Sequence, residues 1–347
     1  MKAVAYQTPG PIDRVDALQD ITLDKPTPAG RDLLVKVEAV SVNPVDTKLR
    51  RRVAPEGGGW RVLGFDAAGV VEAVGPDVEG SDVRGSDVET FQPGDAVYYA
   101  GAINRPGANS EYHLVDCRIA ARRPASLTAA QAAALPLTAI TAWEMLLDRL
   151  EVTRPTAEGG GVILVIGGAG GVGSITLQLL RALTDMTVIA TASRPETQQW
   201  AHACGAHHVI DHRRPLAPQV EALGLGSPGF VFSTTQTGQH WADIARLIAP
   251  QGRVGLIDDP GAIDVSLLKP KAASLHWEFM FARPVHQTPD MAQQGRLLAE
   301  VARLADAGRV RTTLTEVLGR INAATLRAAH AQIETGATRG KLVLEGF

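Results

Sequence analysis

Hydrophobic and polar positions follow two different patterns along the chain, and the change comes near residue 127. Residues 1–126 hold short apolar runs separated by turn residues rich in glycine and proline. We expect strands at 32–42, 64–74, 96–99 and 111–115. Short strands with this punctuation are typical of a compact β-barrel-like domain.

Residues 127–282 alternate apolar runs with helical patterns. The run Val162–Ile166 is apolar throughout, as in a parallel strand that is buried on both faces. The expected strands are Val162–Ile166, Thr187–Ala192, His208–Ile210, Phe230–Ser233, Arg253–Leu256 and Leu275–Phe281. Strands separated by helices predict an α/β domain with a doubly wound parallel sheet.

The last part of the chain returns to the first pattern. A helix is expected from Pro289 to Gly308, followed by Thr312–Val317, Ile321–Gly336 and a strand at Lys341–Leu344. We therefore expect two domains, one formed by residues 1–126 and completed by 283–347, and one formed by 127–282. A length of 347 residues suits two domains.

Composition excludes several functions and suggests a compartment. The hydrophobic fraction of 45% and the net charge of −3 describe an ordinary globular protein without a nucleic-acid or membrane-binding charge. No apolar stretch is long enough to span a membrane, so we expect a cytoplasmic protein. Cys117 and Cys204 are too few for a disulfide framework or a cysteine-based zinc site. Residues 80–84 and 85–89 are near-identical copies, which suggests a surface-loop duplication.

A glycine-rich turn carries the clearest chemical signal. It lies between the expected strand Val162–Ile166 and an apolar helical segment, and it consists of Gly168, Ala169, Gly170, Gly171, Val172 and Gly173. Its glycines fit the pattern G-x-G-x-x-G, in which bare backbone approaches a pyrophosphate at a helix N-terminus. The alternative is a tight strand-to-helix turn that needs glycine only for packing. In this context we expect dinucleotide binding.

The end of the next strand indicates which dinucleotide. Sites for NAD usually place a carboxylate there to bind the ribose 2′-hydroxyl, but this chain has Ser193 and Arg194. A guanidinium can hold a 2′-phosphate with two parallel hydrogen bonds, so we expect NADPH. Glu196 follows Pro195, where it suits the start of the next helix. The alternative for Arg194 is a solvated surface charge.

Several stretches together resemble one known family. They are residues 41–48 (SVNPVDTK), 63–69 (LGFDAAG), 135–143 (LPLTAITAW), the glycine turn, 209–212 (VIDH) and 340–344 (GKLVL). The chain resembles the medium-chain dehydrogenase/reductase superfamily, and within it the quinone oxidoreductase branch and the zinc-type alcohol dehydrogenase-like proteins. The resemblance covers nearly the whole chain. It implies a GroES-like catalytic domain and a Rossmann cofactor domain.

The resemblance also implies that the zinc ligands of the metal-dependent relatives are missing here. Zinc-dependent relatives carry a cysteine ligand in the segment that here contains Asn43 and Asp46, and a histidine ligand where this chain has Phe65. We therefore expect no metal. Without a Lewis acid an alkoxide is hard to stabilise, so the expected substrates are activated acceptors, namely quinones or α,β-unsaturated carbonyl compounds.

Four further positions carry over from the family, each with an alternative. Asn43 matches an asparagine beside the nicotinamide, or it is a loop cap before Pro44. Asp46 matches an active-site carboxylate, or it is the N-cap of a helix beginning near residue 47. Thr138 matches a threonine against the nicotinamide, or it packs at a helix start. Lys341 resembles a lysine near the cofactor, or it ends a surface strand. A tyrosine common in quinone reductases is replaced by Lys48.

Two expectations concern partners and turnover. Leu275–Phe281 is expected at the edge of the parallel sheet, where pairing across a two-fold axis removes an unpaired edge. We therefore expect a homodimer. An NADPH-binding sensor or accessory protein without its own turnover is a second hypothesis, and a zinc-dependent alcohol dehydrogenase is a third.

Overall fold

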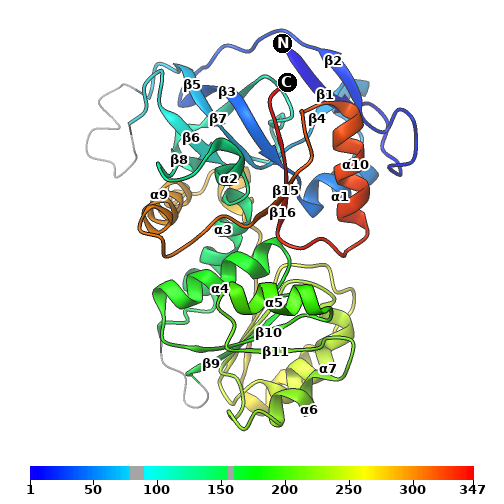
Figure 1. Ribbon diagram of the computed structural model, residues 1–347, viewed down its shortest axis with the longest axis vertical. Coiled ribbons are helices and arrows are strands. Elements are labelled where there is room, and N and C mark those ends of the chain that lie inside the picture. Colours follow the sequence, from blue (N-terminus) through cyan, green and yellow to red (C-terminus); the bar gives the residue numbers. More distant parts are fainter. Residues whose placement is uncertain (79–89, 155–159) are drawn as a thin grey trace. The chain divides into compact units, whose positions relative to one another are not determined.

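The chain forms two compact units (Figure 1). The computed structural model describes residues 1–78, 90–154 and 160–347, so the duplicated segment 80–89 lies outside the described residues. The first unit combines Met1–Ile140 with Phe281–Phe347, and the second is Thr141–Met280. Among the described residues, no helix is long and apolar enough to cross a membrane.

The first unit is built on two β-sheets. Its elements up to the first crossing are β1 (Lys2–Tyr6), β2 (Gln19–Thr22), β3 (Asp32–Ser41), α1 (Pro44–Arg52), η1 (Glu56–Gly58), β4 (Arg61–Val62), β5 (Ala67–Val74), β6 (Ala96–Tyr99), β7 (Tyr112–Asp116), η2 (Cys117–Ile119), β8 (Ala120–Arg122), α2 (Ala129–Ala133) and α3 (Pro136–Trp143), whose end lies in the second unit. After the return it contains α8 (Ala282–His286), α9 (Gln293–Asp306), β15 (Leu314–Val317), α10 (Ala323–Glu334) and β16 (Lys341–Glu345).

Strand β3 organises this unit. The larger sheet has the order β15-β16-β3-β5-β6-β8, with β7 also paired to β3, while β2, β1 and β4 form the smaller sheet. The register of β16 against β3 sets Val343 opposite Ser41. That pairing brings the last strand of the chain to the point where β3 leads into α1. In Figure 1, α10 lies alongside α1, and the two helices pack against each other.

The second unit is a parallel sheet with helices. Its elements are η3 (Glu144–Arg149, a π-helix), β9 (Val162–Ile166), α4 (Gly171–Leu183), β10 (Thr187–Thr191), α5 (Pro195–Ala203), β11 (His208–Ile210), α6 (Leu216–Glu221), β12 (Phe230–Ser233), α7 (Thr237–Leu247), β13 (Arg253–Leu256), η4 (Val265–Lys271) and β14 (Ser274–Trp277). The strand order is β11-β10-β9-β12-β13-β14, and each described pairing is parallel. This confirms the predicted α/β class and doubly wound sheet.

The boundary between the units differs from the sequence-based prediction. Residues 127–140 were assigned to the cofactor domain, but they belong to the first unit. Helix α2 packs on β3, β5 and β16, and the backbone N–H of Leu137 donates to Asp66 Oδ1 at 2.7 Å. Packing and a buried hydrogen bond therefore hold this segment on the first unit, although its helical pattern resembles that of the second.

Candidate functional site

A buried polar cluster lies in the first unit where β3, α1 and β16 meet. Its members are Asn43, Asp46, Asp66 and Lys341, none more than 3% exposed. The ammonium group of Lys341 donates to Asp66 Oδ2 at 2.9 Å, to the Val42 carbonyl at 3.1 Å and to Asn43 Oδ1. A lysine has three donors, so these partners use its full capacity.

The amide of Asn43 is also committed within the cluster. Its Nδ2 donates to Asp66 Oδ2 at 2.8 Å and to the Ser41 carbonyl at 3.3 Å. Asp66 therefore accepts hydrogen bonds from the side chains of Asn43 and Lys341 and from the backbone N–H of Leu137. In this arrangement a substrate oxygen would compete with Asp66 for the Asn43 amide. The predicted roles of Asn43 toward substrate and of Lys341 toward cofactor remain predictions.

Asp46 lies in the first turn of α1 and not at the N-cap position that one of its two alternatives gave it, but its side chain still caps the helix start as part of a capping box with Asn43. Helix α1 begins at Pro44 with Asn43 as its N-cap residue, and proline at the first helical position is pre-set for that geometry. Asp46 accepts from the backbone N–H of Asn43 at 2.8 Å and from that of Gly64 at 3.0 Å. It thereby ties the helix start to the segment before β5.

Burial dominates the electrostatics of the two carboxyls. It raises the pKa of Asp46 to about 7, against the opposing effect of the two backbone N–H donors and of Lys341. Burial also raises the pKa of Asp66, while the charge of Lys341 acts to lower it. Asp66 was missed as a functional candidate. Its only sequence signal is its place after Phe65, at the position where the resemblance implies a ligand motif.

The residues at the position where the resemblance implies a metal ligand do not fit zinc. Phe65 is 1% exposed and packs edge-on against Phe281, with ring centroids 5.5 Å apart. A phenyl ring offers no ligand, and the neighbouring Asp66 is already bonded to Lys341. Across residues 1–78, 90–154 and 160–347, no group of three or more His, Cys, Asp or Glu side chains could hold a metal ion.

The glycine turn in the second unit fits a pyrophosphate. Gly167 has φ +85°, and the N–H of Gly168 donates to the Thr191 carbonyl at 3.0 Å. A Cβ on Gly173 would lie 2.2 Å from the Gly167 carbonyl oxygen, so packing demands glycine there. A Cβ on Gly170 would meet only that same oxygen, at 3.6 Å. Packing does not demand glycine at Gly170, the N-cap of α4, where bare backbone leaves the helix start open to an anion.

Ser193 and Arg194 follow β10, as predicted, and Arg194 is the N-cap residue of α5. The Nε of Arg194 lies 2.7 Å from Glu196 Oε1, in an ion pair whose side chains are 40% and 54% exposed. Glu196 lies in the first turn of α5, as expected. His212 lies nearby, with Nδ1 3.3 Å from Thr191 Oγ1. Burial lowers its pKa, the charge of Asp211 opposes this, and the charges of Arg213 and Arg194 add to the lowering.

The Thr138 hydroxyl is buried and donates to the Leu135 carbonyl at 3.0 Å, as helix-start packing would have it.

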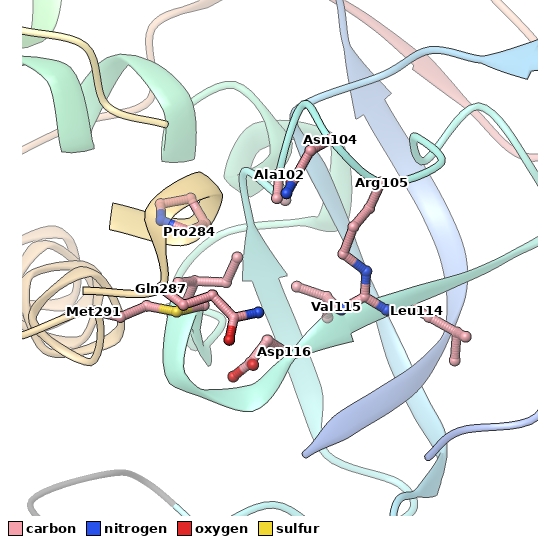
Figure 2. A pocket seen from close by; sticks show the side chains of 11 residues that line it. Ala102, Asn104, Arg105, Leu114, Val115, Asp116, Pro284, Gln287 and Met291 are labelled. Atoms are coloured by element: carbon pink, nitrogen blue, oxygen red, sulfur yellow. The ribbon is translucent and has the colours of Figure 1, made fainter. Parts of the chain in front are cut away.

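A separate pocket in the first unit has about 470 Å³ of empty space, part of it open to solvent. Figure 2 shows Pro284, Gln287 and Met291 on one side of it and Arg105 on another. No member of the buried polar cluster lines this pocket.

Comparison with known proteins identifies the family. Residues 29–125 match the alcohol dehydrogenase GroES-like domain, and residues 204–344 match the zinc-binding dehydrogenase domain. A zinc-type alcohol dehydrogenase-like protein of Staphylococcus aureus is 39% identical over 349 residues, which cover 99% of each chain. The chain belongs to the medium-chain dehydrogenase/reductase superfamily.

Solved structures of this superfamily agree. A putative zinc-dependent alcohol dehydrogenase from Rhizobium etli superposes with a TM-score of 0.95 at 60% identity, covering 100% of this chain and 98% of that one. Mycobacterial Rv1454c, solved with NADPH, gives 0.80 at 26% identity and 99% coverage of both chains. A quinone oxidoreductase of Pseudomonas syringae gives 0.78 at 26% identity and the same coverage. The protein is therefore an oxidoreductase of the medium-chain superfamily with a GroES-like domain and a Rossmann-type sheet.

Proposed function

We propose that this protein is an NADPH-dependent reductase of quinones or α,β-unsaturated carbonyl compounds and that it works without zinc. The observation that carries the proposal is the buried pair Phe65–Phe281 at the family's metal position. Reduction of an activated acceptor needs no Lewis acid, because the negative charge spreads onto a conjugated oxygen. The Rv1454c complex with NADPH and the Pseudomonas quinone oxidoreductase support the cofactor and the substrate class.

The residues that would hold NADPH are those of the glycine turn and Ser193 and Arg194. The open start of α4 suits the pyrophosphate, and the Arg194 guanidinium suits the 2′-phosphate. NADPH supplies a hydride when bound. Thr138 and Lys341 stay proposed cofactor contacts. Lys341 acts first as a positioning residue, because its donors hold Asn43 and Asp66 in place.

Asn43 and Asp46 are the proposed catalytic residues. Asn43 presents an amide whose position is set by Asp66 and Lys341, so its donor is pre-oriented for a developing enolate or quinol oxygen. Using that donor requires the amide to exchange one hydrogen bond. Asp46, with a pKa raised to about 7, can hold or release a proton near neutrality.

The test is oxidation of NADPH, followed by nicotinamide absorbance, with 1,4-benzoquinone, 9,10-phenanthrenequinone and a simple enone. Each assay is run with and without chelator and repeated with NADH. Turnover that resists chelator and prefers NADPH is expected. Clear NADPH binding without turnover on every acceptor would favour the sensor or accessory role. Activity that chelator abolishes and zinc restores would refute the metal-free mechanism.

We also propose a homodimer formed through β14. This strand is the edge of the six-stranded sheet, and exposed apolar side chains lie on or near it: Val265 (55%), Leu267 (44%), Trp277 (52%) and Phe279 (51%). An unpaired edge bordered by such residues favours association with a second copy. Sedimentation of the native chain should give a dimer, and Trp277→Glu should shift it toward monomer. A native monomer at micromolar concentration would contradict this.

A further inference from the structure

The chain crosses between the two units at two places, between residues 140 and 141 and between 280 and 281. Each crossing has a buried glutamate close by in the second unit. Glu144 begins the π-helix η3 and is 1% exposed, while Glu278 follows β14 and is 4% exposed. Single π-helical turns are rare and occur often at functional sites.

These glutamates form one cluster with Arg149. The Nε of Arg149 donates to Glu278 Oε2 at 2.9 Å, and the Glu278 backbone N–H donates to the Leu256 carbonyl at 3.0 Å. Oε1 of Glu278 receives no N–H or hydroxyl donor from the part of the chain that the structure describes. The Glu278 carboxyl lies within hydrogen-bonding reach of the Glu144 carboxyl. Two buried carboxylates in such contact cannot both be charged, so one proton between them completes the cluster.

We propose that Glu144 and Glu278 share one proton and act as a pH-sensitive latch, which fastens the two connecting segments to each other within the second unit. The protonated carboxyl donates to its partner, and Arg149 balances the remaining negative charge. When the latch opens, the shared proton passes to water and both carboxylates become solvated. Burial, followed by the negative charge of Glu144, raises the pKa of Glu278 to about 8 in the closed latch.

The other charged neighbours do not favour opening of the latch as the pH rises. Arg149 lowers the pKa of Glu278, so it acts against the shared proton. Burial lowers the pKa of His276 on β14. The charges of Arg253 and Arg149 act in the same direction, and the charge of Glu151 opposes them. Opening would let His276 take up a proton below about pH 6.5, so its effect on opening has the opposite sign. Above that pH, the shared carboxyl proton dominates the expected dependence.

The direction and the size of the pH dependence of latch opening follow from proton linkage. The closed latch keeps its proton up to about pH 8, whereas a solvated glutamate ionises near pH 4.3. The open form is therefore favoured as pH rises between these values, by up to about tenfold per unit, and the effect levels off near pH 8. From about pH 6.5 to pH 8 the open population should rise between roughly tenfold and twentyfold.

Hydrogen–deuterium exchange of the intact chain tests this. Peptides covering 144–150 and 274–280 are followed at several pH values, with exchange corrected for its intrinsic pH dependence. Protection in the native chain should fall between roughly tenfold and twentyfold over this interval, while the β9 peptide stays constant. Neither cofactor nor substrate is needed, so the result is independent of the proposed activity.

Two variants and a matched control separate the latch from general effects. Glu144→Gln keeps a donor for Glu278 but cannot titrate, and Glu278→Gln keeps an acceptor for Arg149. Glu278→Gln should give protection that no longer depends on pH, and Glu144→Gln should weaken the dependence without removing it, because burial still raises the pKa of Glu278. Glu151→Gln removes a half-exposed acid just beyond the same π-helix and should behave like the native chain. Flat protection in the native chain, or an unchanged pH dependence in both latch variants, would overturn the proposal.

Discussion

Replacing His330 by leucine should stabilise the protein, and increasingly so as the pH falls. His330 lies on α10, is 0% exposed, and neither ring nitrogen has a hydrogen-bond partner in the described residues. Burial lowers its pKa to about 3, and the charge of Arg50 on α1 adds to this. In the unfolded chain the same ring titrates near pH 6.5.

The sign of the stability change with pH follows from these two pKa values of His330. Between about pH 6.5 and pH 3 the unfolded chain binds a proton that the folded chain does not, so stability is lost as pH falls through this window. With these two pKa values, the free energy of unfolding should drop by about 2 kcal/mol from about pH 7 to pH 5 because of this one group. Leucine removes the titration, and it also removes a buried group without hydrogen bonds, which costs about 1–3 kcal/mol.

Urea denaturation of both proteins at several pH values measures the effect. The leucine variant should be more stable at neutral pH, and its advantage should grow by about 2 kcal/mol at about pH 5. His286→Leu, at an exposed position on α8, is the matched control. If His330→Leu kept the native dependence on pH, the ring would be charged or hydrogen-bonded in the folded protein, and the reasoning would fail.

The other predictions concern the proposed cofactor site and the buried cluster. Arg194→Ala should weaken the binding of NADPH by about 1.5–3 kcal/mol and leave the binding of NADH unchanged. Glu196→Gln should strengthen the binding of NADPH, because it frees Arg194 from its ion pair. Calorimetric titration measures both effects, and equal effects on the two cofactors would contradict them. A dianion beside His212 should raise the pKa of its ring, so NADPH should bind more tightly as pH falls from about 8 to 6, and His212→Gln should flatten that profile. Lys341→Met should cost about 3–5 kcal/mol of stability by leaving Asp66 buried without its cation, and adding Asp66→Leu should recover most of it; equal losses in the single and double variants would contradict this pairing.

The sheet of the second unit could be predicted closely from the sequence, because strands buried on both faces are apolar throughout. The expected and observed bounds of Val162–Ile166 and Phe230–Ser233 coincide. The last strand was predicted to reach Phe281 but ends at Trp277. Its partner β13 stops at Leu256, and Asp258 soon after binds the start of α7 through the N–H of Thr237. Local patterns carry no information about where a neighbouring strand turns away.

The contacts within the site could not be predicted in the same way. Asn43 and Lys341 were candidates from their motifs, but their contact joins residues 298 positions apart in the chain. It depends on the register between β3 and β16, which neither strand specifies alone. Asp66 was overlooked for the same reason. Its partners Asn43, Leu137 and Lys341 come from three distant segments, so no local spacing shows that this carboxylate is buried and bonded.

The buried ion pair Asp66–Lys341 is better explained by its orientation of the Asn43 amide than by a contribution to the stability of the fold. Removing a carboxylate and an ammonium from water costs several kcal/mol per ion, and apolar residues of similar volume are often at least as stabilising. The ion pair Asp66–Lys341 nevertheless also holds both ends of the Asn43 amide, through Oδ1 and Nδ2. An apolar replacement would preserve packing and release that amide. If the pair serves orientation, the double variant Asp66→Leu with Lys341→Met should fold stably and lose turnover with the preferred acceptor. Unchanged turnover in that variant would mean that Asn43 has no part in the reaction.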